Sequence, residues 1–555
     1  MNAKPVKTVV LALDGLDPEL FLSWRNNLPN LSTLASEGIF YRIKSTIPSM
    51  TFPAWSTFLT GVNSGRHGIF DFTERLEGRL RVRFINSTRR RYPGFLRLAS
   101  DQGLCVGSVG LPTTYPPEKL TGFQISGFDT PLPSKADRSY VHPPELAEKI
   151  EREIGGYYFG NFNESRIGRN WHGKVLAQLM EGIERKIRLV HLLLREYPLD
   201  LLLLHVGETD TVGHHFWSFY DENSPRYVPT RDHALKRAIQ RVYEKTDDLV
   251  GEVLSLTQPE NVIVVSDHGM GGTSDRMLYL NRFLAENGLL SFQEEDPRAR
   301  IIGALKRAGM KWMPYRWQQQ VFRLAKGEFA ASIESLQRFS GIDWGKTLAY
   351  SEELNYFPSV YLNLKGREPR GIVDPGDADR VISELSNTLS GWKDPESGTN
   401  IVRKVHRRED LYDGPETIHA PDLILELNDC SGYSYALGRS TTPLGRNSWR
   451  KMSSLEYIGK KGGSMNGAHR AWGTMILKTN NKTAAKKENV SLLDMAPTIL
   501  HLSGIQIPDW IEGRNLFSDG KLTSALQFVP VNEKPYSASE EEAIRKKLAQ
   551  LGYLQ

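Results

Sequence analysis

The stretch Thr8-Val-Val-Leu-Ala-Leu13-Asp14-Gly15 is a short apolar run that ends abruptly in a carboxylate and a glycine. Such a run is typical of a strand that is buried on both faces of a parallel sheet. Comparable runs recur along the chain, at Cys105–Leu111, Leu199–Val206, Val262–Val265, Leu423–Leu427 and Met475–Leu477. Because helical patterns lie between these runs, the sequence predicts an α/β fold with a central, mostly parallel sheet and helices on both faces.

The helical patterns are long and amphipathic. One covers Glu19–Glu37, with Asp17 as its expected N-cap. Two others, at 164–197 and 233–257, lie on either side of one predicted strand in the sequence. A charged helix with an apolar stripe is expected at Ser539–Tyr553.

Length and composition exclude several classes of protein. A chain of 555 residues suits one large domain with inserted segments, or two to three domains. Hydrophobic residues make up 39% and charged residues 24%, so the chain is not of the disordered class. The 70 Lys and Arg against 65 Asp and Glu leave a net charge of +5, a small excess that argues against nucleic-acid wrapping.

Only two cysteines occur, Cys105 and Cys430, and they form no CxxC pair. The sequence therefore predicts neither a disulfide framework nor a thiolate zinc site. The first residues lead directly into the apolar run at Thr8, without the features of a signal peptide. A cytoplasmic protein is expected, with a periplasmic protein that has lost its leader as the alternative.

The alternation of predicted strands and helices is interrupted near residue 290 and resumes near residue 466, which suggests two insertions. The expected division is a catalytic core formed by 1–290 and 466–520, a helical cap at 291–365, a second insertion at 366–465, and a tail helix at 521–555.

The stretch 298–327 within the expected cap carries eight Lys and Arg residues and no acid, with aromatic residues interleaved. Such a segment could hold an anionic substrate or contact an anionic membrane surface. The alternative is a cap whose apolar face packs on the body of the protein and whose charges are solvated.

Several side chains that can bind metals stand at or just past the ends of predicted strands: Asp14, Asp210, Asp267 and His268. In open α/β sheets, ligands bind at this carboxyl edge. Carboxylates and imidazoles suit Zn²⁺ or Mn²⁺ better than a metal that prefers thiolates. Taken alone, Asp14 in an Asp-Gly pair could be a turn residue.

Two further histidines extend this set. His214 follows Asp210 by four residues, so both side chains can face one point from a single helical turn, although such a pair can also be a surface contact. The adjacent His215 faces elsewhere and is expected to be structural. His469 precedes the strand expected at Thr474–Leu477, so it can lie in a loop over the same sheet edge, or be a loop histidine without a ligand role.

Thr51 is the candidate nucleophile. A helix is expected to run to Gly61 with Pro53 in its first turn, which places Thr51 at or just before the helix N-terminus. The backbone N–H groups and the helix dipole favour an anion there. The alternative role of Thr51 is an N-cap, and Ser49 is the second candidate hydroxyl.

These motifs together resemble the alkaline phosphatase superfamily. In chain order they are Leu-Asp14-Gly, Pro-Ser-Met-Thr51-Phe-Pro, Thr-Asp210-Thr-Val-Gly-His214, Ser-Asp267-His268-Gly and Gly-Ala-His469. Within that superfamily the chain is most similar to the type I phosphodiesterase/nucleotide pyrophosphatase group, and to its phosphohydrolase/phosphomutase-like branch. The resemblance covers most of the chain and implies an alkaline-phosphatase-like fold with inserted cap segments.

The resemblance also implies a site with two divalent ions, Zn²⁺ or alternatively Mn²⁺. One ion would be held by Asp210, His214 and His469, and the other by Asp14, Asp267 and His268, with the Thr51 oxygen between metal and phosphorus. Three carboxylates against two dications leave a formal charge of +1, which attracts an anionic phosphoester.

The function that follows is a phosphodiesterase for a small phosphoester, acting through a phospho-threonine intermediate. A phosphomonoesterase, or a phosphomutase or phosphotransferase, could use the same site, and the non-enzyme alternative is a metal-stabilised binding scaffold. One departure concerns specificity: nucleotide pyrophosphatases usually carry Asn three positions after the nucleophile, where this chain has Ala54. Arg470, or backbone N–H groups near Phe52, could replace that contact. The sequence assigns no substrate-binding residues and no oligomeric state.

Overall fold

The structure is a computed structural model. It describes residues 5–517 with gaps at 132–137, 158, 160–169, 294–334, 336–337, 441–446, 458–464 and 481–487, and also residues 523–524 and 534–550.

A central eight-stranded sheet has the strand order β2-β19-β9-β1-β8-β5-β6-β7. Its strands are β1 (Thr8–Leu13), β2 (Ile39–Lys44), β5 (Val106–Val109), β6 (Phe123–Ile125), β7 (Val141–His142), β8 (Leu201–Val206), β9 (Asn261–Val265) and β19 (Trp472–Thr479). β1 lies between β8 and β9 and is parallel to both, and β5 continues the parallel part between β8 and β6. β19 and β7 are antiparallel to their neighbours, so the prediction of a mostly parallel sheet is confirmed.

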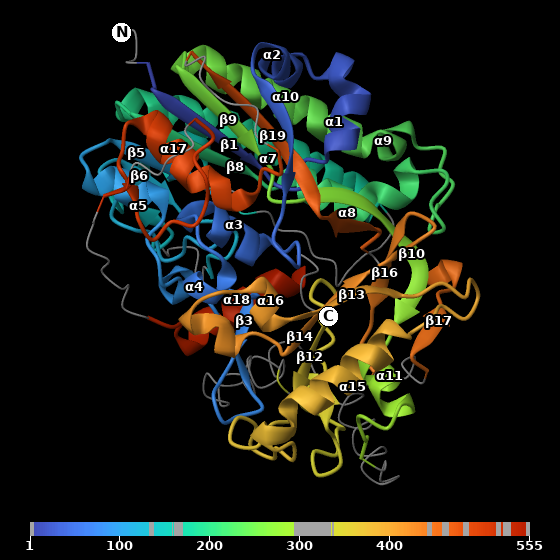
Figure 1. Ribbon diagram of the computed structural model, residues 1–555. Coiled ribbons are helices and arrows are strands. Elements are labelled where there is room, and N and C mark those ends of the chain that lie inside the picture. Colours follow the sequence, from blue (N-terminus) through green and yellow to red (C-terminus); the bar gives the residue numbers. More distant parts are fainter. Residues whose placement is uncertain are drawn as a thin grey trace, which may run out of the picture.

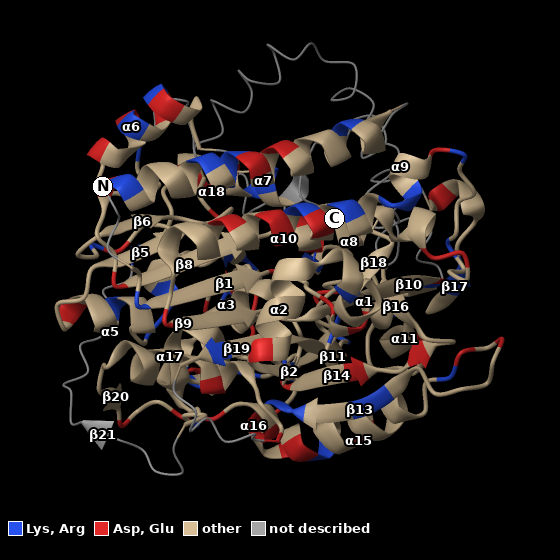
Figure 2. Cartoon of the chain, turned by 90° about the horizontal axis from the view of Figure 1, so that it is seen from above, with Lys and Arg blue, Asp and Glu red and all other residues tan. Residues whose placement is uncertain are grey.

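Helices cover both faces of this sheet (Figures 1 and 2). One face packs against α7 (Trp171–Glu196), α8 (Glu208–Tyr220) and α10 (Ala238–Thr257), the last preceded by the short α9 (His233–Lys236). The other face packs against α3 (Thr51–Thr60), α5 (Phe95–Asp101) and α17 (Met495–Ser503). Figure 2 shows α7 and α10 on one side of the strands and α5 and α17 on the other.

The helix predicted at Glu19–Glu37 is two helices. α1 (Pro18–Trp24) ends in a 3-10 turn (Arg25–Asn27), and α2 (Pro29–Glu37) begins anew. Pro29 causes the break, because it donates no backbone hydrogen bond and disfavours a helical conformation at the preceding residue. The predicted cap is confirmed: the Asp17 carboxylate accepts hydrogen bonds from the N–H groups of Glu19 and Leu20.

β10 (Gly269–Leu278) carries the chain from the central sheet into a second group of strands, seen in the lower part of Figure 1. It pairs with β16 (Tyr433–Leu437), β17 (Trp449–Lys451) and β18 (Gly467–Arg470), and β15 (Asp429–Cys430) joins at the edge through β16. Beside it lies a four-stranded sheet in the order β11 (Ala349–Tyr350), β12 (Ser359–Leu362), β14 (Leu423–Leu427) and β13 (Val402–Arg407). α11 (Leu280–Glu286) and α15 (Ala378–Ser390) share its hydrophobic core.

The strand predicted at Leu423–Leu427 is therefore present as β14, but it is not part of the parallel sheet. It lies in the second sheet and is antiparallel to both neighbours, β12 and β13. Its first three residues are buried and its last two only half-buried, so one end of the strand reaches the surface.

The remaining elements are short. They are α4 (Ser64–His67), the hairpin β3 (Thr73–Arg75) and β4 (Val82–Phe84), α6 (Glu145–Ile154), α16 (Arg408–Leu411), the pair β20 (Ile507–Pro508) and β21 (Thr523–Ser524), and α18 (Ala538–Gln550). α18 confirms the predicted terminal helix over its described residues.

No helix among the described residues is long and apolar enough to cross a membrane. The basic stretch 298–327 lies outside the described residues, and from residue 338 onward the expected cap contains β11 and β12. The division of the chain into core, cap, insertion and tail stays a prediction.

Candidate metal centre

The carboxyl ends of three neighbouring strands supply the acidic side chains of the site. Asp14 follows β1, Asp210 lies in the first turn of α8 directly after β8, and Asp267 follows β9. Since β1 pairs with both β8 and β9, the three carboxylates converge at one edge of the sheet. This is the edge that the strand pattern predicted.

Three histidines complete the cluster. His268 follows Asp267, and His214 lies one turn after Asp210 on α8, with its Nε2 3.1 Å from Asp210 Oδ1. His469 comes from β18, where it pairs in register with Met270 of β10. The expected loop position of His469 is therefore wrong: it lies in a strand, because β10 offers its edge to residues 467–470.

The structure contains two sets of three possible ligand atoms, and within each set the atoms lie within 4.8 Å of one another. One set comes from Asp210, His268 and His469, and the other from Asp14, Asp267 and His268. His268 belongs to both sets, with its Nε2 3.4 Å from Asp14 Oδ1 and 3.9 Å from Asp210 Oδ1. His214 adjoins the first set, with its Nε2 3.0 Å from His469 Nε2.

Backbone carbonyl groups fix the orientation of all three imidazoles. His214 Nδ1 lies 2.8 Å from the Gly467 oxygen, His469 Nδ1 2.8 Å from the Ser49 oxygen, and His268 Nδ1 3.0 Å from the Gly269 oxygen. A carbonyl oxygen only accepts hydrogen bonds, so each Nδ1 carries the proton. Each ring then turns its Nε2 toward the centre, and such a second partner on the other ring nitrogen is typical of metal-binding histidines.

The centre therefore collects acceptors and few donors. Asp14 Oδ1, Asp267 Oδ2, His268 Nε2 and Thr51 Oγ1 are all buried and make no hydrogen bond within the described part of the chain. A buried polar atom without a partner carries a large desolvation cost. Oxygen and nitrogen lone pairs that face one another in this way fit divalent cations, which would satisfy all of them at once.

The pKa values reflect this crowding. Burial, followed by the charges of Asp14 and Asp210, raises the pKa of Asp267 well above its usual range. Burial also raises the pKa of Asp210, but the nearby His214 and His469 outweigh it and hold that pKa well below the usual range. Burial and the neighbouring His469 lower the pKa of His268 to about 4, so that its ring is neutral at pH 7.

Two residues that sequence reasoning missed hold Asp14 in place. His205 Nε2 on β8 and Trp55 Nε1 on α3 both reach Asp14 Oδ2, at 3.1 and 3.2 Å. The other oxygen, Oδ1, is thereby directed into the centre. His205 is the single polar side chain in the strand Leu201–Val206, and this break in an apolar run was the available signal.

Thr51 is the first residue of α3, as predicted, with Pro53 in the first turn and Gly61 at the left-handed C-cap position. Two contacts place this helix start over the cluster. The Ser49 oxygen accepts from His469, and Trp55, one turn after Thr51, donates to Asp14. Thr51 as a whole is only 1% exposed.

Ala54 is fully buried and packs in the hydrophobic cluster beneath α3, so no polar side chain reaches the centre from this position. Arg470 does not replace the missing contact. Its guanidinium donates to Asp429 Oδ1 at 2.5 Å and to the Gly432 oxygen at 2.7 Å. His215 is buried against Trp171, with ring centroids 5.2 Å apart, and belongs to neither set of ligand atoms.

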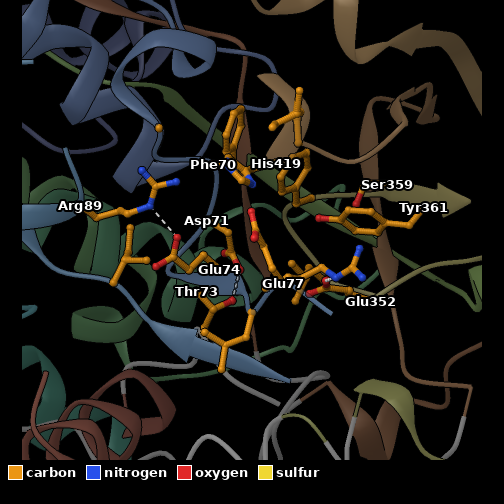
Figure 3. A pocket seen from close by; sticks show the side chains of 18 of the residues that line it. Phe70, Asp71, Thr73, Glu74, Glu77, Arg89, Glu352, Ser359, Tyr361 and His419 are labelled. Carbon is orange, nitrogen blue, oxygen red and sulfur yellow. Dashed lines mark hydrogen bonds and ion pairs between the residues drawn. The ribbon is translucent and has the colours of Figure 1, made fainter. Parts of the chain in front are cut away.

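A cavity of about 460 Å³ opens beside the cluster and is lined in part by Ser49 and His469. A second cavity, of about 90 Å³, lies between the β3–β4 hairpin and the second sheet (Figure 3). In its lining, Arg89 donates to Glu74 at 2.5 Å and Arg75 pairs with Glu352 at 3.8 Å. None of the residues expected at the metal site lines this second cavity.

Comparison with known proteins adds independent information. A family model described as type I phosphodiesterase / nucleotide pyrophosphatase matches residues 8–450. Rat ectonucleotide pyrophosphatase/phosphodiesterase family member 3 is 23% identical over 301 residues, which cover 53% of this chain and 28% of the relative. Ectonucleotide pyrophosphatase/phosphodiesterase 1 of Saccharomyces cerevisiae is 26% identical over 293 residues, which cover 47% of this chain and 34% of the relative. The match thus spans about a third, or less, of the length of these relatives.

Among solved structures, phosphonoacetate hydrolase from Sinorhizobium meliloti in complex with phosphonoformate aligns with a TM-score of 0.53 and 15% identity. The alignment covers 90% of this chain and 96% of that chain, which shows a shared alkaline-phosphatase-like fold.

Proposed function

Because the chain belongs to the type I phosphodiesterase / nucleotide pyrophosphatase family, we propose that it is a metal-dependent phosphoester hydrolase and, more narrowly, a phosphodiesterase. One observation carries the proposal. Buried carboxylate oxygens and imidazole nitrogens face one another beside a buried threonine hydroxyl, with no hydrogen bond among the described residues to Asp14 Oδ1, Asp267 Oδ2 or His268 Nε2.

Two divalent cations, Zn²⁺ or Mn²⁺, would occupy this centre. Asp210, His214 and His469 would hold one ion, and Asp14, Asp267 and His268 the other. Bound dications would supply Lewis-acid stabilisation of the charge that develops on the attacking and departing oxygens. Because His268 belongs to both sets of ligand atoms, the geometry supports a pair of ions close together.

Thr51 would act as the nucleophile. Its Oγ1 forms a bond to phosphorus while the bond from phosphorus to the departing oxygen breaks. The hydroxyl proton of Thr51 ends on the departing alcohol, and the phosphoryl group, with its remaining ester group, stays on Thr51. The N-terminus of α3 stabilises the negative charge of the phosphoryl oxygens. Water then attacks phosphorus from the side opposite Thr51 while the bond to Oγ1 breaks. One proton of the water returns to Thr51 Oγ1 and the phosphomonoester is released, so two displacements give net retention at phosphorus.

The substrate would be a small phosphoester. The contact that an Asn at position 54 would supply is absent, and Arg470 is committed to other partners. Nucleotide specificity of the kind found where that Asn is present is therefore not expected.

The test begins with protein stripped of metal by a chelator and reloaded with Zn²⁺ or Mn²⁺. Bis(p-nitrophenyl) phosphate and p-nitrophenyl phosphate are compared as substrates. Metal-dependent release of p-nitrophenol, faster from the diester, is expected. No metal-dependent turnover of either compound would overturn the proposal, and faster turnover of the monoester would make the protein a phosphomonoesterase.

The nucleophile is tested with Thr51→Ala. This variant should lose turnover by on the order of 10³-fold or more, while it retains bound metal and its unfolding temperature. Thr60→Ala, in the same helix but remote from the centre, is the matched control and should keep turnover. Acid quenching during turnover of bis(p-nitrophenyl) phosphate, followed by peptide mapping, should find a p-nitrophenyl phosphoryl group on Thr51; the same group on Ser49 instead would reassign the nucleophile.

A further inference from the structure

The cavity of about 460 Å³ beside the metal centre has a lining that indicates what it binds. We infer that this cavity holds the organic group of the phosphoester, and that this group is uncharged and rich in hydroxyls, as in a sugar or a polyol. This inference rests on the proposed function. The candidate metal centre alone does not indicate which organic group the substrate carries.

The position of the cavity suits a group attached to the reacting phosphorus. Ser49 and His469 belong both to its lining and to the centre, where the Ser49 oxygen holds His469 Nδ1 at 2.8 Å. Further lining residues come from β14, in the four-stranded sheet, and from β16, which pairs with β10. The volume of the cavity lies in the range of about 300–1,000 Å³ that is usual for small-molecule sites.

Charge in the lining is balanced. Arg403 pairs with Glu426 at 2.6 Å, Arg470 pairs with Asp429 at 2.5 Å, and all four side chains line the cavity. Each guanidinium therefore already faces a carboxylate, and the two charges of each pair cancel. A second phosphate group, as in a pyrophosphate, would have to compete with these carboxylates, whereas an uncharged group would not.

Uncharged polar groups of the lining, in contrast, are available. Five of its side-chain groups make no hydrogen bond with the described residues: Ser49 Oγ, Thr273 Oγ1, Ser434 Oγ, Asn355 Nδ2 and Asn428 Oδ1. Three of them are hydroxyls that donate and accept, one is an amide donor and one an amide acceptor. A sugar or polyol hydroxyl also donates and accepts, so it can pair with any of the five.

Aromatic side chains supply the apolar part of the wall. Tyr356 stacks on His469 with ring centroids 4.9 Å apart, and Trp472, which also lines the cavity, is 42% exposed. An aromatic face beside hydrogen-bonding groups suits the C–H face of a sugar ring.

Competition measures this preference without a labelled substrate. Three unlabelled diesters are compared as competitors of bis(p-nitrophenyl) phosphate turnover: dimethyl phosphate, methyl glyceryl phosphate and methyl glucosyl phosphate. A methyl ester of pyrophosphate is the charged comparison. The glucosyl diester is expected to compete at least about tenfold better than dimethyl phosphate, and the pyrophosphate ester no better than dimethyl phosphate.

Two variants test whether the preference for the glucosyl diester over dimethyl phosphate arises from this cavity. Ser434→Ala and Asn428→Ala should each reduce the glucosyl-to-dimethyl ratio about threefold or more. The matched control is Tyr433→Phe, because Tyr433 precedes Ser434 on β16, points away from the cavity and bonds Asp221. It should leave the ratio unchanged.

The outcomes separate the two proposals. Turnover of bis(p-nitrophenyl) phosphate without any hydroxyl preference, or with a preference for the pyrophosphate ester, would overturn the inference and leave the phosphodiesterase intact. A preference that survives both cavity variants would also overturn it. Absence of turnover would instead remove the proposed function on which it rests.

Discussion

His205 Nε2 lies 3.1 Å from Asp14 Oδ2. His205 is in β8, and Asp14 directly follows β1, the parallel strand beside it. A carboxylate only accepts, so His205 donates, and Trp55 donates to the same oxygen from the other side. Both donors therefore bind Oδ2, on the side of the Asp14 carboxylate that faces away from the candidate metal centre. The remaining oxygen, Oδ1, faces His268 at 3.4 Å.

Loss of His205 is expected to weaken metal binding without removing a ligand. His205→Phe should lower affinity for Zn²⁺ about 10–100-fold, the usual effect of removing a residue that orients a ligand. His205→Gln, which keeps a donor, should lose less. Competition with a chromogenic chelator measures the affinity, and His191→Phe, a surface histidine that pairs with Glu252, is the control. Equal affinity in His205→Phe and the control would show that Trp55 alone orients Asp14.

Asp267→Asn should raise the stability of the metal-free protein and reduce the stability gained on binding metal. The pKa of Asp267 is raised by burial and by Asp14 and Asp210, so its ionised form destabilises the metal-free fold at neutral pH. Since the carboxyl group is protonated in both folded and unfolded states well below pH 3.8, this cost disappears in acid. The variant should therefore have a higher unfolding temperature than wild type at pH 7 without metal.

The same variant should gain less stability from added Zn²⁺, because it has lost a ligand charge. Thermal unfolding with and without metal measures both effects, with Asp248→Asn on the surface as the control. A metal-induced shift equal to that of wild type would contradict a ligand role for Asp267.

His67 should make folding stability depend on pH. Its Nδ1 accepts from the Ile69 N–H at 3.1 Å, so its Nε2 carries the proton and donates to Thr57 Oγ1. Burial, with Arg90 and Arg89 nearby, lowers the pKa of His67 to about 3. Between pH 6.5 and about 3 the unfolded chain therefore takes up a proton that the folded chain refuses, and stability falls as pH falls.

His67→Gln removes this dependence. Urea unfolding at pH 6.5, 5.5 and 4.5 should show wild type losing about 1.4 kcal/mol more per pH unit than the variant in the lower part of this range. The variant should be less stable at pH 6.5, since the Ile69 N–H loses its acceptor. Parallel pH profiles for the two proteins would mean that His67 takes up its proton in the folded state.

Gly467 is expected to be necessary for the close approach of β18 to α8. A Cβ at this position would lie 2.3 Å from the Gly213 oxygen and 3.1 Å from His214 Cα. Gly467→Ala should therefore displace β18, and with it His469, and lower both stability and metal affinity.

The control is Gly173→Ala, because nothing lies within 4 Å of a Cβ at this exposed position in α7. That substitution should raise stability by about 0.5–1 kcal/mol, the usual gain from Ala over Gly inside a helix. Chelator competition and urea unfolding measure both variants. Unchanged metal affinity in Gly467→Ala would show that β18 can shift without moving His469.

The local pattern of the chain was sufficient to identify the main strands and most of the helices. Runs such as Val9–Leu13 are uniformly apolar because both of their faces are buried, and Asp17 caps a helix through its nearest neighbours in sequence. The residues at the strand ends could also be found, because parallel strands bring their carboxyl ends to one edge. Their role as metal ligands stays a proposal.

Other features required the tertiary structure. β14 has the composition of a buried strand, and only its packing assigns it to the second sheet. His469 reaches the cluster because β18 pairs with β10, nearly 200 residues earlier in the chain. His205 and Asp14 are 191 residues apart, and no pattern in the sequence predicts the hydrogen bond between them.

The sequence by itself determined which residues are apolar, which can bind a metal or attack phosphorus, and where short-range caps and turns form, since these depend on neighbours along the chain. Only the tertiary structure decided which side chains meet, which oxygen of Asp14 is used for support, and that a cavity with balanced charge opens beside His469. The physical reason is that burial and the pairing of polar groups arise from contacts between distant segments, and these exist only after the sheets have packed together.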